Sequence, residues 1–290
     1  MIVSIEISGL VIFPADFFIL YPVFTKLYSA YLSCYLQYYK NKGYYGIDWF
    51  SHAMMIQYEL GTFVNTKIKA FNQEICPMLN VKIFQFNPLQ ENTYLVYDDQ
   101  KNCLIFDPGC YFDNERENLV AFIGEKGLNP VQLWNTHCHL DHVFGNKFIY
   151  ETYQLELYIH EGEKKVLDRA PESGLMWNIP FDNYAGPIHT IQGDTSFSFG
   201  GETVQILETP GHSPASISFY FPNSGFVIAG DVLFRESVGR TDLPGANPDI
   251  LVNSILQKLY SLPDETIVYS GHGMPTTIGH EKKHNPFVKA

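Results

Sequence analysis

The most constraining feature of this chain is a short run of potential metal ligands that directly follows an apolar segment. Residues 136–142 have the sequence Thr-His-Cys-His-Leu-Asp-His, and the preceding residues 131–134 predict a strand. The run places four potential ligands within six positions: His137, His139, Asp141 and His142. Imidazole and carboxylate groups suit zinc, manganese or iron. Because these groups gather at the end of a predicted strand, a metal site explains them better than a surface cluster of unrelated histidines.

Three further potential ligands share one placement, at the end of an apolar run and beside a glycine. They are His212 in Pro-Gly-His-Ser, Asp231 in Ala-Gly-Asp and His272 in Ser-Gly-His-Gly. Glycine allows the backbone to turn and to approach other groups closely. Active sites of α/β proteins collect at one edge of their strands. We therefore expect these three side chains to meet the first motif in a single site.

The order of these motifs resembles the pattern of the metallo-β-lactamase fold, and the resemblance covers residues 78–290. It implies an α/β protein, an αββα sandwich with two divalent metal ions at one edge. Zinc is the expected metal, with iron and manganese as alternatives. The resemblance assigns the ligands of the first ion as His137, His139 and His212. It assigns those of the second ion as Asp141, His142 and His272, with Asp231 bridging the two ions.

Finer features resemble the glyoxalase II-like hydrolases of that superfamily. Asp231 stands where the zinc β-lactamases with a full histidine triad carry Cys. Residues 230–244 resemble the Gly-Arg-[Ser/Thr]-Asp segment of short glyoxalase II-like hydrolases and of persulfide dioxygenases, and residues 279–287 resemble the ending of the short hydrolases. Full-length glyoxalase II continues into a helical domain that holds glutathione. We expect that domain to be absent here, because the sequence ends at Ala290.

The expected activity is that of a metal-dependent hydrolase acting on a small-molecule thioester, similar to the hydroxyacylglutathione hydrolases. Two cations about 3.5–4 Å apart share one hydroxide and lower the pKa of its parent water towards neutrality. This metal-bridging hydroxide attacks the thioester carbonyl. Asp141 and Asp231 are the expected catalytic residues, Asp231 by bridging the ions and Asp141 by orienting the nucleophile. The leaving thiolate is a weak base, so the reaction needs no dedicated general acid, and no organic cofactor is expected.

Other functional classes stay open at this point. A mono-iron persulfide dioxygenase also carries the Gly-Arg-Thr-Asp segment and also lacks the glutathione domain. A lactone or phosphodiester hydrolase of the same fold uses the same ligands. A non-catalytic binding protein is disfavoured, because every expected ligand position is intact. Metal content measured together with thioester hydrolysis separates the expected thioester hydrolase from these other classes.

Several residues outside the ligand set have two possible roles. Asp107, in Phe-Asp-Pro-Gly after a predicted strand, either accepts a hydrogen bond from a ligand histidine or begins a turn. Arg240 and Asp242 are expected to pair and to support the loop beneath the metals, the alternative being a solvated ion pair. Cys138 lies between two ligand histidines, and we expect it to be a small buried residue and not a ligand.

From Met78 onward, strands and helices alternate. The expected strands are 81–86, 93–97, 103–106, 131–134, 157–160, 203–208, 215–221, 225–229 and 266–269. The expected helices are 113–126, 143–153 and 248–260. Residues 170–188 predict a long loop, in which Met176, Trp177 and Tyr184 either line a substrate pocket or pack in the core.

Residues 1–77 differ from the rest and form an aromatic-rich N-terminal extension. They carry five Lys and five acidic residues, whereas the whole chain has a net charge of −12. We expect the catalytic domain to span residues 78–290, and residues 1–77 to be appended or mis-assigned. Residues 26–40 are the best helical candidate there. The apolar run 9–24 contains Asp16 and is broken by two prolines, so we expect neither a secretory signal nor a membrane partner.

The composition limits which binding partners and which cellular compartment are expected. Hydrophobic residues make up 46% of the chain and charged residues 17%, a balance that supports a large core and excludes wholesale disorder. The acidic balance disfavours binding to a phosphate backbone, so no nucleic acid partner is expected. Five Cys without a Cys-x-x-Cys pair favour a reducing cytoplasm over a disulfide framework. The oligomeric state is left open.

Overall fold

The computed structural model describes residues 6–7, 10–11 and 79–289. The chain divides into two units, Met1–Phe71 and Asn72–Ala290. In the first unit, β1 (Glu6–Ile7) pairs antiparallel with β2 (Leu10–Val11). The helix expected at residues 26–40 and the domain boundary expected at residue 78 lie outside the described residues. All seven candidate ligands belong to the second unit.

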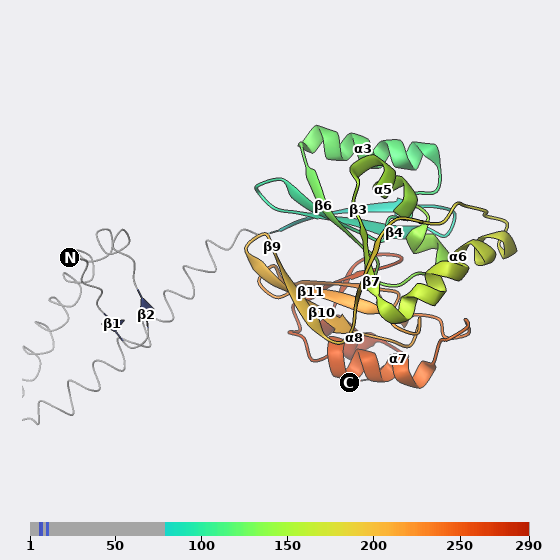
Figure 1. The fold of residues 1–290 in the computed structure, drawn as a ribbon. Coiled ribbons are helices and arrows are strands. Elements are labelled where there is room, and N and C mark those ends of the chain that lie inside the picture. The colour runs from blue at the N-terminus through green and yellow to red at the C-terminus, as the bar shows by residue number, and fades with distance from the viewer. Residues whose placement is uncertain (1–5, 8–9, 12–78, 290) are drawn as a thin grey trace, which may run out of the picture. The chain divides into compact units, whose positions relative to one another are not determined.

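Two six-stranded sheets form the centre of this second unit, and they lie face to face (Figure 1). The first has the order β3-β4-β5-β6-β7-β8, with β3 (Asn80–Phe86), β4 (Glu91–Tyr97), β5 (Asn102–Phe106), β6 (Asn129–Trp134), β7 (Leu157–His160) and β8 (Ile188–Ile191). The second has the order β16-β15-β12-β11-β10-β9, with β16 (Thr276–Thr277), β15 (Ile267–Ser270), β12 (Phe226–Gly230), β11 (Ile217–Phe221), β10 (Glu202–Glu208) and β9 (Thr195–Phe199).

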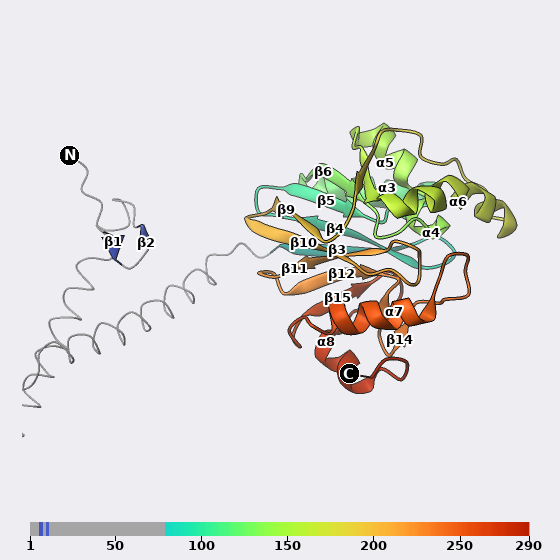
Figure 2. The same ribbon diagram turned by 60° about the horizontal axis from the view of Figure 1, so that its bottom comes forward.

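Helices cover the outer face of each sheet, as Figure 2 shows. The first sheet is covered by α3 (Asp113–Lys126), α5 (Asn146–Tyr153) and α6 (Lys164–Met176). The second is covered by α7 (Pro248–Ser254), the π-helical turn that continues it (Ile255–Leu259), and α8 (Ile278–His284). Short α4 (Leu140–Val143), a 3₁₀ turn (Glu161–Glu163) and the hairpin of β13 (Leu233–Phe234) and β14 (Ser237–Val238) complete the unit. The expected αββα sandwich is confirmed.

Successive side chains of a strand point to opposite faces of its sheet, and the apolar ones form three hydrophobic layers. In β12, Phe226 and Ile228 pack between the two sheets, whereas Val227 and Ala229 pack against the helices of the second sheet. In the first sheet, Leu95 of β4 packs toward the helices, and its neighbour Tyr94 points between the sheets. Side chains alternate across a strand, so a sheet covered on both faces needs apolar residues at consecutive positions. This explains the continuous apolar runs that predicted the strands.

The element predictions hold best where a start or stop signal is strong. Helix α3 has the predicted bounds, and Gly127 ends it in the left-handed conformation with φ of 63°. The helix predicted over 143–153 corresponds to α5, which begins three residues later, after α4 has ended at Val143. Between them, Gly145 donates its N–H to the Pro108 carbonyl at 2.6 Å. The predicted helix 248–260 begins as predicted and ends in the π-helical turn.

The loop predicted over residues 170–188 is wrong in its first part. Helix α6 extends to Met176 and contains Pro171. Its buried residues Leu167, Ala170 and Gly174 recur at helical spacing against the core. Proline and glycine suggested a loop, but packing of this face outweighs their low helix propensity. Among the described residues, no helix is long and apolar enough to cross a membrane.

Candidate metal centre

The seven predicted ligands lie at one edge of the sandwich, each after the C-terminal end of a strand. His137, His139, Asp141 and His142 follow β6 in the first sheet. His212, Asp231 and His272 follow β10, β12 and β15 of the second sheet. Backbone hydrogen bonds join the sheets at this edge, from Ile217 N to Thr136 O at 2.9 Å and from Asn92 N to Gly271 O at 2.7 Å. The fold therefore brings together all seven residues.

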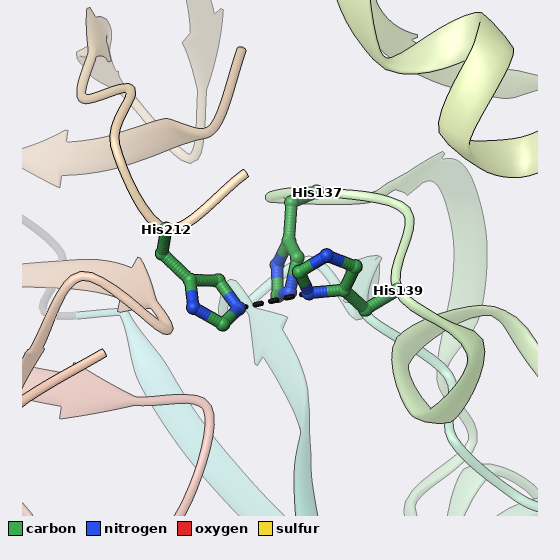
Figure 3. Close-up of side chains that lie close together, drawn as sticks. All are labelled: His137, His139 and His212. Carbon is green, nitrogen blue, oxygen red and sulfur yellow. Dashed lines mark hydrogen bonds between the residues drawn. The ribbon is translucent and has the colours of Figure 1, made fainter. Parts of the chain in front are cut away.

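Three histidines form the first cluster, drawn in Figure 3. His139 Nδ1 lies 2.8 Å from His212 Nε2, and the rings of His137 and His212 are 4.9 Å apart at their centroids. One ring nitrogen from each histidine lies within 4.8 Å of the other two. His137 comes from the loop after β6 and His212 from the loop after β10, so the cluster joins both sheets. Three imidazoles that converge in this way are able to hold one divalent cation.

A second cluster contains Asp141, His142 and His272, whose ligand atoms also lie within 4.8 Å of one another. His272 Nε2 is 3.1 Å from Asp141 Oδ2, and His142 Nε2 is 3.8 Å from the same oxygen. His142 is completely buried, whereas the side chain of His272 is 28% exposed. The second cluster thus opens to solvent on the side of His272.

Asp231 lies between the two clusters. Its Oδ2 atom is 3.4 Å from His212 Nε2 in the first cluster, and its Oδ1 atom is 3.4 Å from His142 Nε2 in the second. Oδ2 also lies 3.5 Å from His272 Nε2. A single buried carboxylate therefore faces both clusters, which is the placement that a bridging ligand requires.

Buried polar atoms without partners show that these residues fit metal ions. His137 Nε2, His142 Nε2 and Asp231 Oδ1 are buried, and within the described part of the chain none has a hydrogen-bond partner. An unpaired buried polar group costs about 1–3 kcal/mol, so such groups are rare in native proteins. Of the seven such atoms among the described residues, these three belong to the two clusters and to the carboxylate between them, and all are ligand types that divalent metals accept. The donor set therefore fits divalent cations.

In four of the candidate ligand histidines, one ring nitrogen contacts an oxygen atom of the protein. His212 Nδ1 donates to the Arg240 carbonyl at 2.8 Å, and His272 Nδ1 donates to the Gln90 carbonyl at 3.2 Å. His137 Nδ1 lies 3.1 Å from Thr136 Oγ1. His142 is held in the same way by a carboxylate. Such contacts fix the ring orientation and leave Nε2 available for a cation.

Asp107 is the carboxylate that holds His142. Its Oδ2 atom is 3.1 Å from His142 Nδ1, and it also accepts the Thr136 hydroxyl at 2.6 Å. The Thr136 N–H donates to Asp107 Oδ1 at 2.7 Å. Of the two roles expected for Asp107, this contact confirms the first, in which Asp107 accepts a hydrogen bond from a candidate ligand histidine. Although Asp107 groups geometrically with His137 and His142, its oxygens are occupied by these donors, so it supports the ligands from outside.

The other predicted neighbours of the site have mixed outcomes. Arg240 and Asp242 pair through two hydrogen bonds of 2.7 Å, and both side chains are at least half exposed. The Arg240 carbonyl, and not this ion pair, contacts the ligand His212. Cys138 is buried as predicted, and burial raises the pKa of its thiol well above the usual range. Its Sγ atom is not among the groups that converge on either cluster.

The three residues with two suggested roles, pocket lining or core packing, have different surroundings in the structure. Tyr184 packs in the core and donates its hydroxyl hydrogen to the Pro187 carbonyl at 2.6 Å, so the alternative core role is confirmed. Met176 is 84% exposed and Trp177 50% exposed at the end of α6. A hollow of about 420 Å³ near α3 and α5 is lined by other residues, including Tyr111 and Phe144. Met176 and Trp177 are therefore exposed at a helix end, and neither is among the residues that line this hollow.

Burial and neighbouring charges shift the pKa values of the site histidines in two opposite directions. Burial and the neighbouring histidines lower the pKa of His137 well below its usual range and that of His139 to about 3. Burial acts in the same direction on His142 and His272, but the carboxylates of Asp141 and Asp231 raise the pKa of both. These fields therefore favour the neutral form of His137 and His139 and the protonated form of His142 and His272, whose protons a cation would displace.

Sequence reasoning missed the groups that hold the ligands from behind. Thr136 stands inside the first motif, and a hydroxyl directly before a ligand histidine was an available signal. The carbonyls of Gln90 and Arg240 carry no side-chain signal at all. Glu163 lies 25 positions beyond Cys138 and still accepts the Cys138 N–H. Only the tertiary structure places these groups beside the site.

Comparison with known proteins now places the chain in a family. A profile of the metallo-beta-lactamase superfamily matches residues 86–272. The chain belongs to this superfamily. It is 41% identical over 203 residues to the probable metallo-hydrolase YqgX of Bacillus subtilis, a match that covers 69% of this chain and 93% of that protein. It is 35% identical over 214 residues to the hydroxyacylglutathione hydrolase GloC of Haemophilus influenzae, covering 73% of this chain and 99% of the relative.

Solved structures agree with this placement. The BLEG-1 B3 metallo-beta-lactamase superposes with a TM-score of 0.68 at 37% identity, covering 73% of this chain and all of that one. TTHA1623, solved in a di-iron-bound form, superposes with a TM-score of 0.65 at 38% identity, covering 72% of this chain and all of that one. The chain is therefore a metallo-hydrolase superfamily member, and members of this fold family bind divalent metals.

Proposed function

We propose that this protein hydrolyses thioesters of small thiols, of which a hydroxyacylglutathione is the first to test. The observation that carries the proposal is the convergence of all seven predicted ligands at one edge of the sandwich. Similarity to GloC over 99% of the length of that relative supports the choice of a thioester. The similarity of BLEG-1, a beta-lactamase by description, makes an amide of the lactam type the matched counter-substrate.

Two divalent ions are proposed as the cofactors. His137, His139 and His212 would hold one, and Asp141, His142 and His272 would hold the other, with Asp231 facing both. When bound, such ions supply a water of lowered pKa and polarise the carbonyl that it attacks. Zinc is the first expectation from the histidine-rich donor set, and the di-iron form of TTHA1623 makes iron the principal alternative.

The residues of the chain orient the participants. Asp107 holds His142 so that its Nε2 atom faces Asp231. Asp141 Oδ2, 3.1 Å from His272 Nε2, is placed on the more exposed side of the centre, where it can accept a hydrogen bond from the attacking water. The leaving thiolate is a weak base and departs without a proton donor. No residue needs to serve as a general acid, which suits a site whose described groups are histidines and carboxylates.

The test combines elemental analysis with activity on one sample. We expect about two metal ions per chain and hydrolysis of S-lactoylglutathione, with His139→Ala prepared in parallel as the inactive control. A β-lactam is assayed at the same concentration and is expected to react far more slowly. One iron per chain, no thioester cleavage and oxygen uptake with glutathione persulfide would replace the proposal by a dioxygenase. Two metals with cleavage of a lactone or phosphodiester alone would replace the substrate class.

A further inference from the structure

Glu163 is a buried carboxylate that belongs to neither ligand cluster. It ends the 3₁₀ turn Glu161–Glu163 and directly precedes α6, and its exposed fraction is 0%. A carboxylate that leaves water for a protein core carries a large desolvation cost unless hydrogen bonds replace its hydration. The position of those replacement bonds therefore shows what this side chain does.

Both oxygens of Glu163 accept hydrogen bonds from segments that carry metal-ligand candidates. Oε2 accepts the Cys138 N–H at 2.9 Å, and Cys138 lies between His137 and His139. Oε1 accepts the Ser213 hydroxyl at 2.6 Å and the Ala215 N–H at 2.9 Å, and Ser213 directly follows His212. One carboxylate thus connects the loop after β6 in the first sheet with the loop after β10 in the second.

We propose that Glu163 is a positioning residue that clamps these two loops together and so preorganises the three-histidine site. The proposal depends on His137, His139 and His212 holding a metal ion, and it is independent of the substrate. Without the clamp, the two loops have to find their mutual position when the cation binds. That ordering cost would appear as weaker metal binding at the first cluster and not at the second.

The pattern of donors explains why a carboxylate occupies this position. Backbone N–H groups only donate, so the Cys138 and Ala215 contacts both require an acceptor. Glutamine at position 163 would retain one oxygen for Ser213 and Ala215. Its NH₂ group would then face the Cys138 N–H, and two donors would oppose each other. Glu163→Gln therefore keeps the size of the side chain and breaks the contact with the loop of His137 and His139.

A matched control exists on the same sandwich. Glu202 is also buried, and it also accepts hydrogen bonds from two backbone N–H groups and one serine hydroxyl. Its donors are Asn223 and Ser224, which precede β12 and carry no ligand. Glu202→Gln therefore removes the same kind of contact outside the ligand loops. Ser213→Ala provides a milder change on the His212 side of the clamp.

The measurement is Zn²⁺ affinity of the metal-stripped full chain, determined by competition with a chelator. We expect Glu163→Gln to bind one of its two ions about 10-fold or more weakly, which is the usual loss for a group that supports a ligand from behind. Ser213→Ala should show a smaller loss in the same direction. Glu202→Gln should bind both ions as the wild type does, even where its metal-free form unfolds at a lower denaturant concentration.

Two variants, each of which keeps only one intact cluster, serve as backgrounds that show which cluster binds its ion more weakly. In His272→Ala the first cluster remains, and adding Glu163→Gln should weaken the remaining ion. In His139→Ala the second cluster remains, and adding Glu163→Gln should change nothing. The visible spectrum of bound Co²⁺ gives a second readout, because it reports ligand geometry and should change for Glu163→Gln but not for Glu202→Gln.

The proposal fails if Glu163→Gln and Ser213→Ala bind both ions with wild-type affinity, or if both backgrounds weaken equally. It also fails if Glu202→Gln weakens metal binding as much as Glu163→Gln does, because the effect would then be general destabilisation. If Glu163→Gln does not fold, Ser213→Ala carries the same test. Absence of thioester hydrolysis in the wild type would overturn the proposed function and leave this inference standing.

Discussion

At the scale of single residues, most of the candidate ligand histidines direct one ring nitrogen to a protein oxygen and the other to the candidate metal centre. His212 and His272 donate one N–H to a backbone carbonyl, and His142 contacts the Asp107 carboxylate. The opposite nitrogens face the clusters, where His142 Nε2 has no hydrogen-bond partner among the described residues. The orientation of each ring is therefore set before a cation binds, which lowers the ordering cost of binding.

Asp231→Ala should remove both metal binding and hydrolysis. This substitution deletes the only carboxylate that, among the described residues, lies within 3.5 Å of histidines from both clusters. The loss should exceed the 10- to 100-fold that is typical for a group behind the ligands. Elemental analysis and S-lactoylglutathione turnover measure it. Asp99→Ala, an exposed carboxylate in the turn between β4 and β5, is the control and should behave as the wild type. Two retained ions with full turnover in Asp231→Ala would contradict the bridging role.

Metal affinity should rise with pH, and binding should release protons. The carboxylates of Asp141 and Asp231 overcome the effect of burial and raise the pKa of His142 and His272, so a cation must displace protons there. In the metal-free protein those protons contribute stability below about pH 6.5, and this contribution is lost as the pH rises through the raised pKa values. Calorimetry of Zn²⁺ binding in two buffers of different ionisation enthalpy counts the protons. A proton count of zero at pH 7 would contradict the assignment.

At the scale of elements, glycines at the ends of strands allow the backbone to pack closely against the candidate ligands and their neighbours. Gly230 ends β12 with φ of 51°, and a Cβ atom there would lie 2.3 Å from Thr136 Oγ1. A Cβ atom at Gly271, directly after β15, would lie 2.0 Å from Asp231 Oδ1 and 2.7 Å from His142 Cε1. Close packing at this edge of the sandwich therefore requires glycine at positions 230 and 271.

Gly271→Ala should lose metal with little change in the rest of the fold. The added methyl group would displace Asp231 or His142, both of which face the centre. We expect Zn²⁺ to bind at least about 10-fold more weakly, by the same measure as for other supporting groups. Gly124→Ala is the control, because Gly124 is an exposed residue of α3 and a Cβ atom there would meet nothing within 4 Å. It should raise the free energy of unfolding by about 0.5–1 kcal/mol and leave metal binding unchanged. Equal metal affinity in both variants would contradict the packing argument.

At the scale of the molecule, the two sheets, their helices and all seven candidate ligands lie within residues 79–289. The three hydrophobic clusters of the described residues extend from Leu79 to Val288. The relatives GloC and TTHA1623 match 73% and 72% of this chain and are themselves matched over 99% and 100% of their length. The sandwich therefore carries what this chain shares with its relatives.

A chain of residues 78–290 should keep the metal content, the hydrolytic activity and the unfolding midpoint of the full protein. The reason is that the clusters and all seven predicted ligands lie within this range. Purified fragment and full chain are compared by elemental analysis, S-lactoylglutathione turnover and denaturant unfolding. A fragment that folds but binds fewer ions would show that residues 1–77 contribute to the site.

The sequence by itself indicated an α/β protein and the identity of the candidate ligands, whereas the αββα layers were implied by the resemblance to a family. Consecutive apolar residues indicate strands buried on both faces, and Gly127 marks the end of α3. Ligand spacing is a local property, so residues 136–142 were recognisable without any structure. By contrast, α6 was missed because its helical face is stabilised by the core and not by its own propensity.

Only the tertiary structure decided which groups hold those ligands in place. Glu163, Asp107 and the carbonyls of Gln90 and Arg240 act on ligands 28 to 182 positions away or on the loops beside them. Contacts of this kind depend on how two sheets meet at one edge, and a backbone carbonyl has no residue type that a sequence could reveal. The ligands could therefore be predicted from local spacing, whereas their orientation follows from the packing of segments that are distant in the chain.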